Sequence, residues 1–260
     1  MSELISGTVA NGLATITLSR PEAGNAMNWA LVDSLFKTIE RLSTTPGIRA
    51  FLIVAEGKNF CVGGDIRSFV GDPQPAAALG RLAKRLHEAQ LLLAAHPAPV
   101  IVAAQGASAG AGLSLAASAD ILLAADDAQF SMAYAGIGLT GDGGATWFLP
   151  RLVGLRVAQE MAYLGRRLSA EEGLRLGLVT RIVPSATLLE EARSLAAVLA
   201  QGPTKAFGEI KALFAGGDQR DLEQHLDMEA DSMVAARSTQ DAEEGIAAFL
   251  ERRKPAFQGR

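Results

Sequence analysis

The chain is poor in the residues that mark disulfide-bonded, metal-binding or nucleic-acid-binding proteins. Its 260 residues include one cysteine, Cys61, and three histidines with no ligand spacing among themselves or to Cys61. The net charge is -4, and the longest basic run is Arg252-Arg253-Lys254. A nucleic-acid surface needs clustered lysine and arginine to neutralise phosphates. We therefore expect no internal disulfide, no metal site and no nucleic-acid partner.

Long hydrophobic runs are also scarce. The longest apolar stretches, near 91–104 and 113–125, are broken by His, Pro, Ser or Asp before they reach the roughly twenty residues that a membrane span requires. The opening segment MSELISGTVANG has neither a basic region nor an apolar core, both of which a secretion signal has. The sequence predicts a cytoplasmic protein without a membrane partner.

What the chain does have is 49% hydrophobic residues, enough for a sizeable core, arranged in alternating strand and helix patterns. Asn11-Gly12 predicts a hairpin turn, Asn28 a helix cap, and Ser169 to Glu172 a capping box. The expected strands are 5–9, 13–18, 50–55, 100–104 and 179–183. The expected helices include 28–42, 75–95, 156–164 and 169–176. From residue 186 onward every pattern is helical.

These patterns predict an α/β body over residues 1–200, followed by a helical region over 201–260. Breaks at 202–203, 215–217 and near 238 divide the second region into separate helices. Short amphipathic helices of this kind cannot bury their apolar faces alone. We expect them to pack on the body and on neighbouring subunits, as an oligomerisation region.

Two of the predicted strands lead into glycine loops. Residues 50–55 precede FCVGGDI (60–66), and residues 100–104 precede GASAGAG (106–112), which opens a helix. Amides at such turns lack backbone acceptors and favour negative charge, so a developing oxyanion would fit there. Alternatively, the small residues only allow the helix to pack closely on its strand. The spacing leaves both interpretations open.

A third glycine-rich stretch, 141–144, carries the carboxylate Asp142. Asp142 is a candidate acid or base, or else a cap for the helix that contains Trp147. We interpret Asp65 and Asp120 as structural, because they stand at element boundaries. His87, on the predicted 75–95 helix, has the character of a surface or hydrogen-bonded histidine rather than a catalyst.

Six segments, in the right order along nearly the whole chain, resemble the enoyl-CoA hydratase/isomerase (crotonase) superfamily. The resemblance implies a spiral of ββα units and a C-terminal helical trimerisation region. It also implies an acyl-CoA thioester substrate, no separate cofactor, and a homotrimer or dimer of trimers. The segments are Arg20-Pro21 with Asn25–Asn28, Phe60–Ile66, Pro99–Ile101 with Gly106–Gly112, Gly138–Trp147, Leu168–Ala170 with Gly177–Val179, and Lys254–Phe257.

The resemblance also implies roles for individual residues. The family's two oxyanion-binding amides correspond to Gly64 and Ala111. Arg67 and Lys254 match positions where the family places basic residues near CoA phosphates, with a solvated surface role as the alternative. The residues implied to contact CoA are Ala26, Val62, Gly64, Ile66, Arg67 and Lys254.

The chain departs from the family pattern at the catalytic acids. The two glutamates that hold water in the family's hydratases correspond to Ser114 and Tyr134, and neither is a carboxylate. Asp142 resembles the single acid of the double-bond isomerases, including the ring-epoxide isomerase of bacterial phenylacetate breakdown. The resemblance therefore implies an isomerase in which Asp142 moves a proton between the α carbon and C4 of a thioester enolate.

Three alternatives stay open from the sequence. In the aryl-CoA dehalogenases, an aspartate matching Asp142 attacks the ring, a histidine matching His87 activates water, and an aromatic matches Tyr134. Gly64, however, replaces an aromatic expected in that branch. The second alternative is an atypical hydratase, and the third is a non-catalytic acyl-CoA-binding protein.

Overall fold

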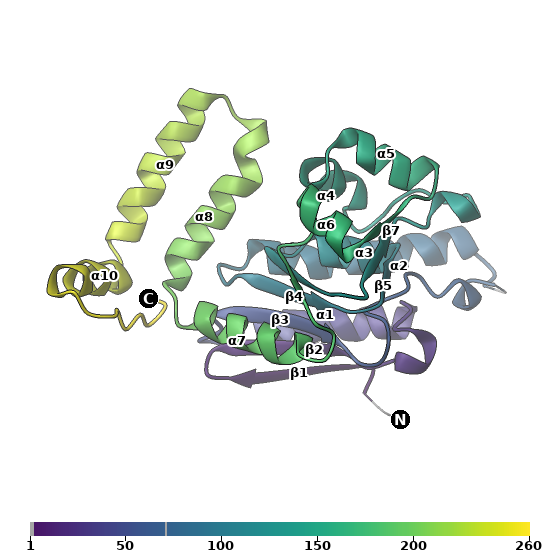
Figure 1. The fold of residues 1–260 in the computed structure, drawn as a ribbon, viewed down its shortest axis with the longest axis horizontal. Helices are drawn as coiled ribbons and strands as arrows, with labels where there is room; N and C mark the ends of the chain where they lie inside the picture. The colour runs from purple at the N-terminus through teal and green to yellow at the C-terminus, as the bar shows by residue number, and fades with distance from the viewer. Residues whose placement is uncertain (1–2, 71) are drawn as a thin grey trace.

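The computed structural model describes residues 3–70 and 72–260, which form an α/β body and a projecting helical arm (Figure 1). The body begins with a hairpin in which β1 (Ile5–Ala10) pairs antiparallel with β2 (Leu13–Leu18). At its turn Asn11 and Gly12 have φ values of 51° and 78°, the positive angles that an Asn-Gly pair adopts easily. The predicted hairpin is confirmed.

The larger sheet has six strands in the order β1-β2-β3-β4-β6-β9, and all but β1 run parallel to one another. β3 and β4 are neighbours, so the two glycine loops that follow them leave the same edge of the sheet. Ligands of open α/β sheets bind at this edge. The remaining strands are β3 (Ala50–Ala55), β4 (Val100–Ala104), β6 (Ile121–Ala125) and β9 (Arg181–Val183).

A second, three-stranded sheet in the order β5-β7-β8 was not expected from the sequence. Its strands are β5 (Ala107–Ala109), β7 (Gln129–Ser131) and β8 (Arg167–Ser169). The segment 106–112, predicted as a turn, therefore contains a strand. Three residues are too few to show a period of two, and their pairing partners lie far away in sequence. Such strands exist because tertiary pairing holds them, not because of local preference.

Helices cover both faces of the larger sheet. Phe51 and Val102 belong to the hydrophobic cluster on the α1, α2 and α3 side, whereas Leu52 belongs to the cluster beneath α7. Asn28 caps α1 as predicted, since its Oδ1 accepts a hydrogen bond from the Leu31 amide at 2.9 Å. The helices of the body are α1 (Trp29–Ser43), α2 (Pro75–Ala95), α3 (Ala111–Ala117), α4 (Ala145–Leu152), α5 (Leu155–Tyr163), α6 (Ala170–Leu176) and α7 (Leu188–Ala200).

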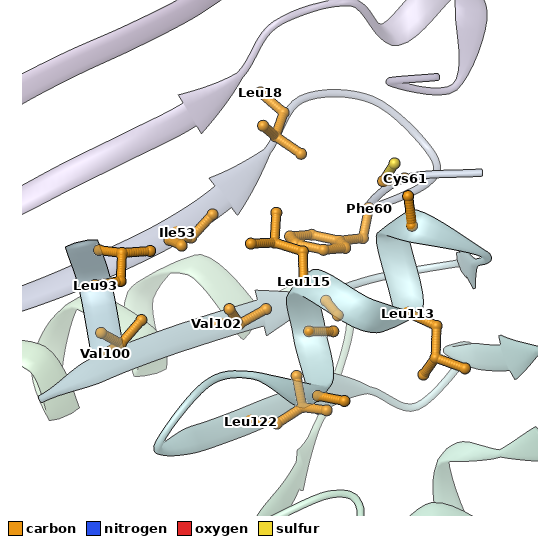
Figure 2. Packing of buried hydrophobic residues seen from close by; sticks show 14 of the residues in the cluster. Leu18, Ile53, Phe60, Cys61, Leu93, Val100, Val102, Leu113, Leu115 and Leu122 are labelled. Carbon is orange, nitrogen blue, oxygen red and sulfur yellow. The ribbon is translucent and has the colours of Figure 1, made fainter. Parts of the chain in front are cut away.

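α3 is buried along its whole length. Leu115 lies beside Phe60 in the core, where side chains from α3, β3 and β4 meet (Figure 2). At the start of the helix, a Cβ placed on Gly112 would lie 2.2 Å from the carbonyl oxygen of Cys61. The small residues of α3 therefore do allow close packing, on the loop after β3 as well as on the strands.

The arm consists of α8 (Thr204–Gly216), α9 (Leu222–Arg237) and α10 (Gln240–Glu251), and it extends from the body after α7 (Figure 1). Arg49 attaches its base, because its Nη2 donates to the carbonyls of Gly202 and Phe257 at 2.7 and 3.0 Å. Lys211 of α8 forms an ion pair with Asp120 at 3.0 Å. The role of residues 201–260 in oligomerisation stays a prediction. Within the ranges given above, no helix is long and apolar enough to cross a membrane.

The contact between α3 and the loop after β3 predicts a stability difference between two glycine variants. Gly112→Ala should lower the free energy of unfolding by about 2 kcal/mol, because the new methyl overlaps a backbone oxygen. Gly80→Ala is the matched control, since nothing lies within 4 Å of a Cβ placed there on α2. It should be neutral or stabilise by up to about 1 kcal/mol. Urea unfolding of both variants makes the comparison, and equal effects would contradict the packing described.

Candidate active site

The loop after β3 is held as an extended segment between two others. On one side the Cys61 amide donates to the Ala107 carbonyl at 3.1 Å, and the Ala109 amide donates back to Cys61 at 2.9 Å. On the other side the Met27 amide donates to the Gly63 carbonyl at 2.8 Å. Backbone pairing on both sides fixes the direction of every amide in this loop.

The amides of Gly64 and Ala111 lie where the two glycine loops meet. Ala111 begins α3, so its N–H has no acceptor within the helix. Among residues 3–70 and 72–260, no acceptor bonds the amide of Gly64 or that of Ala111. A glycine with positive φ precedes each donor: Gly63 at 101° and Gly110 at 51°. The loops are in contact, because a Cβ on Gly63 would lie 3.0 Å from the Ala109 carbonyl oxygen.

Both donors line one cavity of about 190 Å³. Asp142 also lines it, and it is the sole acidic residue among the described lining residues. Tyr134 contributes a second polar group. The rest of the wall is largely apolar and includes Met27, Val32, Phe69, Leu79, Leu82, Leu86, Ile137 and Leu139. The cavity thus combines backbone donors for an anion with one carboxylate in an apolar setting.

The Asp142 carboxylate is bonded to Tyr134, whose hydroxyl donates to Oδ1 at 2.5 Å. Its side chain does not cap the following helix: α4 has Gly144 at its N-cap and no side-chain cap. The capping alternative is therefore wrong. The main-chain oxygen of Asp142 accepts from the Ala145 amide instead, at 3.0 Å. The carboxylate is left facing the cavity.

The Tyr134 phenol stays a hydrogen-bond donor because two effects oppose its ionisation. Burial, followed by the negative charge of Asp142, raises the pKa of Tyr134 well above its ordinary value. Ser114 continues the network: its buried hydroxyl lies 3.0 Å from the Tyr134 hydroxyl, and it donates to the Asp142 carbonyl at 2.8 Å. Hydroxyl groups therefore occupy the two positions that the resemblance matched to glutamates.

His87 lies behind the Asp142 loop and is not one of the residues that line the cavity. Its Nε2 accepts a hydrogen bond from the Gly143 amide at 3.0 Å. Gln90 donates to the Gly143 carbonyl at 2.9 Å. No motif marks Gln90 in the sequence, although its position one helical turn after His87 places both on the same face of α2.

The residues implied to contact CoA divide into two groups. Val62, Gly64 and Ile66 line the cavity, and the side chains of Val62 and Ile66 are exposed. Ala26, Arg67 and Lys254 do not line it. Ala26 is buried beside the loop, and Arg67 is exposed on the short 3₁₀ helix η2 (Ile66–Ser68) that follows the loop. Lys254 follows α10 in the arm.

The other candidate groups have structural partners. Asp65 accepts from Arg20 at 2.7 Å, and Asp120 accepts from the Val100 amide at 2.7 Å, which supports the structural interpretation of both. Burial raises the pKa of the Cys61 thiol to about 12. In the described part of the chain, no three His, Cys, Asp or Glu side chains gather as a metal site requires.

Known proteins resemble this chain over its full length. A family model described as Enoyl-CoA hydratase/isomerase matches residues 8–260. The 1,2-epoxyphenylacetyl-CoA isomerase of Escherichia coli (strain K12) is 38% identical over 262 residues, covering 100% of both chains. A Rhodobacter capsulatus protein named "Probable enoyl-CoA hydratase" is 39% identical over 97% of this chain and 96% of its own. A crystal structure from Mycobacterium abscessus, assigned to enoyl-CoA hydratase/isomerase, has a TM-score of 0.94 at 36% identity, covering 98% of this chain and 100% of that one.

The raised pKa of Tyr134 predicts how its phenol titrates. Tyr134 should keep its proton until the protein unfolds, because burial and the negative charge of Asp142 raise its pKa. The unfolded chain loses the Tyr134 proton above about pH 10 while the folded chain keeps it, so the free energy of unfolding falls as the pH rises. Absorbance titration of the Tyr163→Phe and Tyr134→Phe variants separates the two phenols. Tyr163→Phe keeps only Tyr134. If the folded variant still showed an ordinary tyrosine titration, the buried phenol bonded to Asp142 would be contradicted.

Proposed function

Because the chain belongs to the enoyl-CoA hydratase/isomerase family, we propose that it is an acyl-CoA double-bond isomerase with Asp142 as its acid and base. The observation that supports this proposal is the single carboxylate in an apolar cavity that also receives the free amides of Gly64 and Ala111. Together they provide one proton-transfer group and one oxyanion site, which is the minimum for moving a double bond along a thioester.

The reaction follows from these groups. The thioester oxygen of a 3-enoyl-CoA accepts from both amides, and Asp142 removes a proton from C2. The electron pair of that C–H bond enters the conjugated enolate, whose oxygen charge the amides stabilise. Asp142 then returns the proton at C4, and the double bond moves to C2–C3. Each oxyanion donor contributes about 3 kcal/mol to lowering such a barrier.

Tyr134 and Ser114 support isomerisation more than hydration. Adding water across a double bond requires a base for the water and an acid for the neighbouring carbon. The Ser114 hydroxyl is already bonded to the Asp142 carbonyl, and the phenol of Tyr134 is bonded to Oδ1. That contact leaves the second oxygen of Asp142 for the substrate.

The position of His87 supports the dehalogenase alternative less well than it supports an isomerase. A base that activates water needs a free lone pair beside the substrate. The Nε2 lone pair of His87 accepts from the Gly143 amide, and His87 is absent from the residues that line the cavity. The acyl-CoA assay separates an isomerase from an atypical hydratase, which adds water, and from a non-catalytic acyl-CoA binder, which turns nothing over.

We also propose how the CoA part binds. Val62, Gly64 and Ile66 line the cavity, Val62 and Ile66 with exposed side chains, and would follow the pantetheine, with Ala26 nearby. Arg67 and Lys254 carry the charges for the CoA phosphates. Lys254 lies in the arm. It would contact the CoA phosphates only if the arm packs beside a cavity, either that of the same chain or that of a neighbouring chain.

For assembly, we propose a homotrimer or a dimer of trimers formed through the arm. Large apolar side chains are exposed on its three helices: Phe214 is 83%, Leu222 72%, Phe249 81% and Leu250 74% accessible in the single chain. Apolar surface on this scale is typical of an interface. Subunit packing would remove it from water.

Asp142→Asn should abolish isomerisation of 3-hexenoyl-CoA, because an amide cannot accept the C2 proton at neutral pH. Mass spectrometry of a mixed acyl-CoA panel, with proton exchange in deuterated water, distinguishes the reactions. Isomerisation leaves the mass unchanged, hydration adds water, and 4-chlorobenzoyl-CoA loses chloride if the protein is a dehalogenase. Asp231→Asn on α9 is the matched control and should keep full activity. An Asp142→Asn variant that folds and turns over at the wild-type rate would remove Asp142 from the mechanism.

Light scattering during gel filtration should give three or six copies of the 27.1 kDa chain. Phe249→Glu should shift this mass toward the monomer, because it places a charge on the proposed apolar interface. Val70→Glu is a control on the body, at a side chain that is also exposed, and should leave the mass unchanged. A wild-type monomer would contradict the proposed assembly.

A further inference from the structure

The backbone that carries Asp142 is fixed by side chains from two helices. The peptide group between Asp142 and Gly143 is bonded at both ends: Ser114 Oγ donates to its carbonyl oxygen at 2.8 Å, and its N–H donates to His87 Nε2 at 3.0 Å. The next carbonyl, that of Gly143, accepts from Gln90 Nε2 at 2.9 Å. Two consecutive peptide groups therefore have fixed directions.

The packing around Gly143 leaves this loop little room to relax. Gly143 has a φ of 56°, and a Cβ placed on it would lie 2.8 Å from the Ser114 Cβ and 3.4 Å from Leu86 Cδ2. The direction of an aspartate side chain follows from its backbone dihedral angles. The orientation of the Asp142–Gly143 peptide therefore determines where the carboxylate points in the cavity. A displacement of about 1 Å in a reacting group can cost about a hundredfold in rate.

We propose that His87 is a positioning residue that holds Asp142 in its reactive orientation through the Gly143 amide, and does so only while its imidazole is neutral. This inference rests on the proposed function, since it concerns how Asp142 is aimed at the substrate. A neutral imidazole has one acceptor nitrogen, whereas the imidazolium has two N–H donors and no acceptor. Protonation would set a donor against the Gly143 N–H and release the peptide.

Charged groups on the neighbouring elements do not replace His87 in this role. α3 has no titratable side chain, and α4 contributes Arg151. Asp33 of α1 is engaged by Lys37 and by Arg85 of α2. Carboxylates, lysine and arginine ordinarily keep their charge between about pH 5.5 and 8, whereas an imidazole changes its charge there. The other titratable groups on these elements are Asp33, Lys37, Glu40 and Arg41 on α1, Arg81, Lys84, Arg85 and Glu88 on α2, Tyr134 and Asp142 on the cavity loop, and Arg151 on α4.

The test compares His87→Gln with His87→Ala in the isomerase assay. Glutamine reaches as far as Nε2 and offers a carbonyl acceptor that does not titrate. In the wild type, kcat should fall about tenfold once acid protonates the imidazole, because the imidazolium offers no acceptor to the Gly143 amide. In His87→Gln it should change less than about twofold over the same pH change. In His87→Ala, kcat should be about tenfold lower or worse at every pH, with KM nearly unchanged.

His225→Gln is the control, because it makes the same substitution at a histidine on α9, away from Gly143, and should keep the wild-type pH profile. The proposal would be overturned if kcat of His87→Gln fell in acid as much as kcat of the wild type. It would also be overturned if His87→Ala kept the wild-type kcat. Either result would show that the hold on Gly143 does not govern Asp142.

The hydrogen bond can be tested without substrate. The chain has three histidines, so long-range ¹H–¹⁵N spectra of the rings can be assigned with His87→Gln and His225→Gln. At about pH 8 the His87 ring should carry its proton on Nδ1, with Nε2 as an acceptor. A proton on Nε2 would overturn the proposal whatever the activity. Absence of turnover at every pH in the wild type would overturn the isomerase function instead, and the ring spectra would still decide this hydrogen bond.

Discussion

The pairing of one extended loop between two neighbouring segments is the constraint on which the rest of the site depends. Residues 60–65 receive backbone hydrogen bonds from β5 on one side and from the segment around Met27 on the other. Asn25, fully buried, braces that segment by donating to the carbonyls of Glu56 and Asn59. Because the loop cannot rotate, the Gly64 amide keeps its direction before any ligand arrives, as electrostatic preorganisation requires.

The acid side of the cavity is organised by neutral groups. Tyr134, Ser114 and His87 contact Asp142 or its backbone through hydroxyl and imidazole atoms, and no second carboxylate among the described lining residues competes with it. A like charge nearby would disfavour the ionised base. Donors aimed at Asp142 instead stabilise the carboxylate and restrict its orientation. Tyr134 therefore engages Oδ1 of the one carboxylate among the described residues that line the cavity.

Much of this molecule was predictable because local signals and tertiary structure agree. The hairpin at Asn11-Gly12, the Asn28 cap, the buried strands β3 and β4 and the capping box at Ser169 follow from turn chemistry and periodicity. The three-residue strands β5, β7 and β8 did not, since distant pairing creates them. Tertiary contact also determines the hydrogen bonds of Asp142 and Gln90. The Asp142 carboxylate accepts from Tyr134 rather than from the amides that begin α4, and Gln90, which carries no motif, donates to the Gly143 carbonyl.

The most direct measurement is a crystal structure with a bound, unreactive acyl-CoA thioester. We expect the thioester oxygen within about 3 Å of the amide nitrogens of both Gly64 and Ala111. We also expect an Asp142 carboxylate oxygen about 3 to 3.5 Å from the α carbon. A thioester oxygen bound elsewhere, or a carboxylate turned toward bulk water away from the acyl carbons, would contradict it.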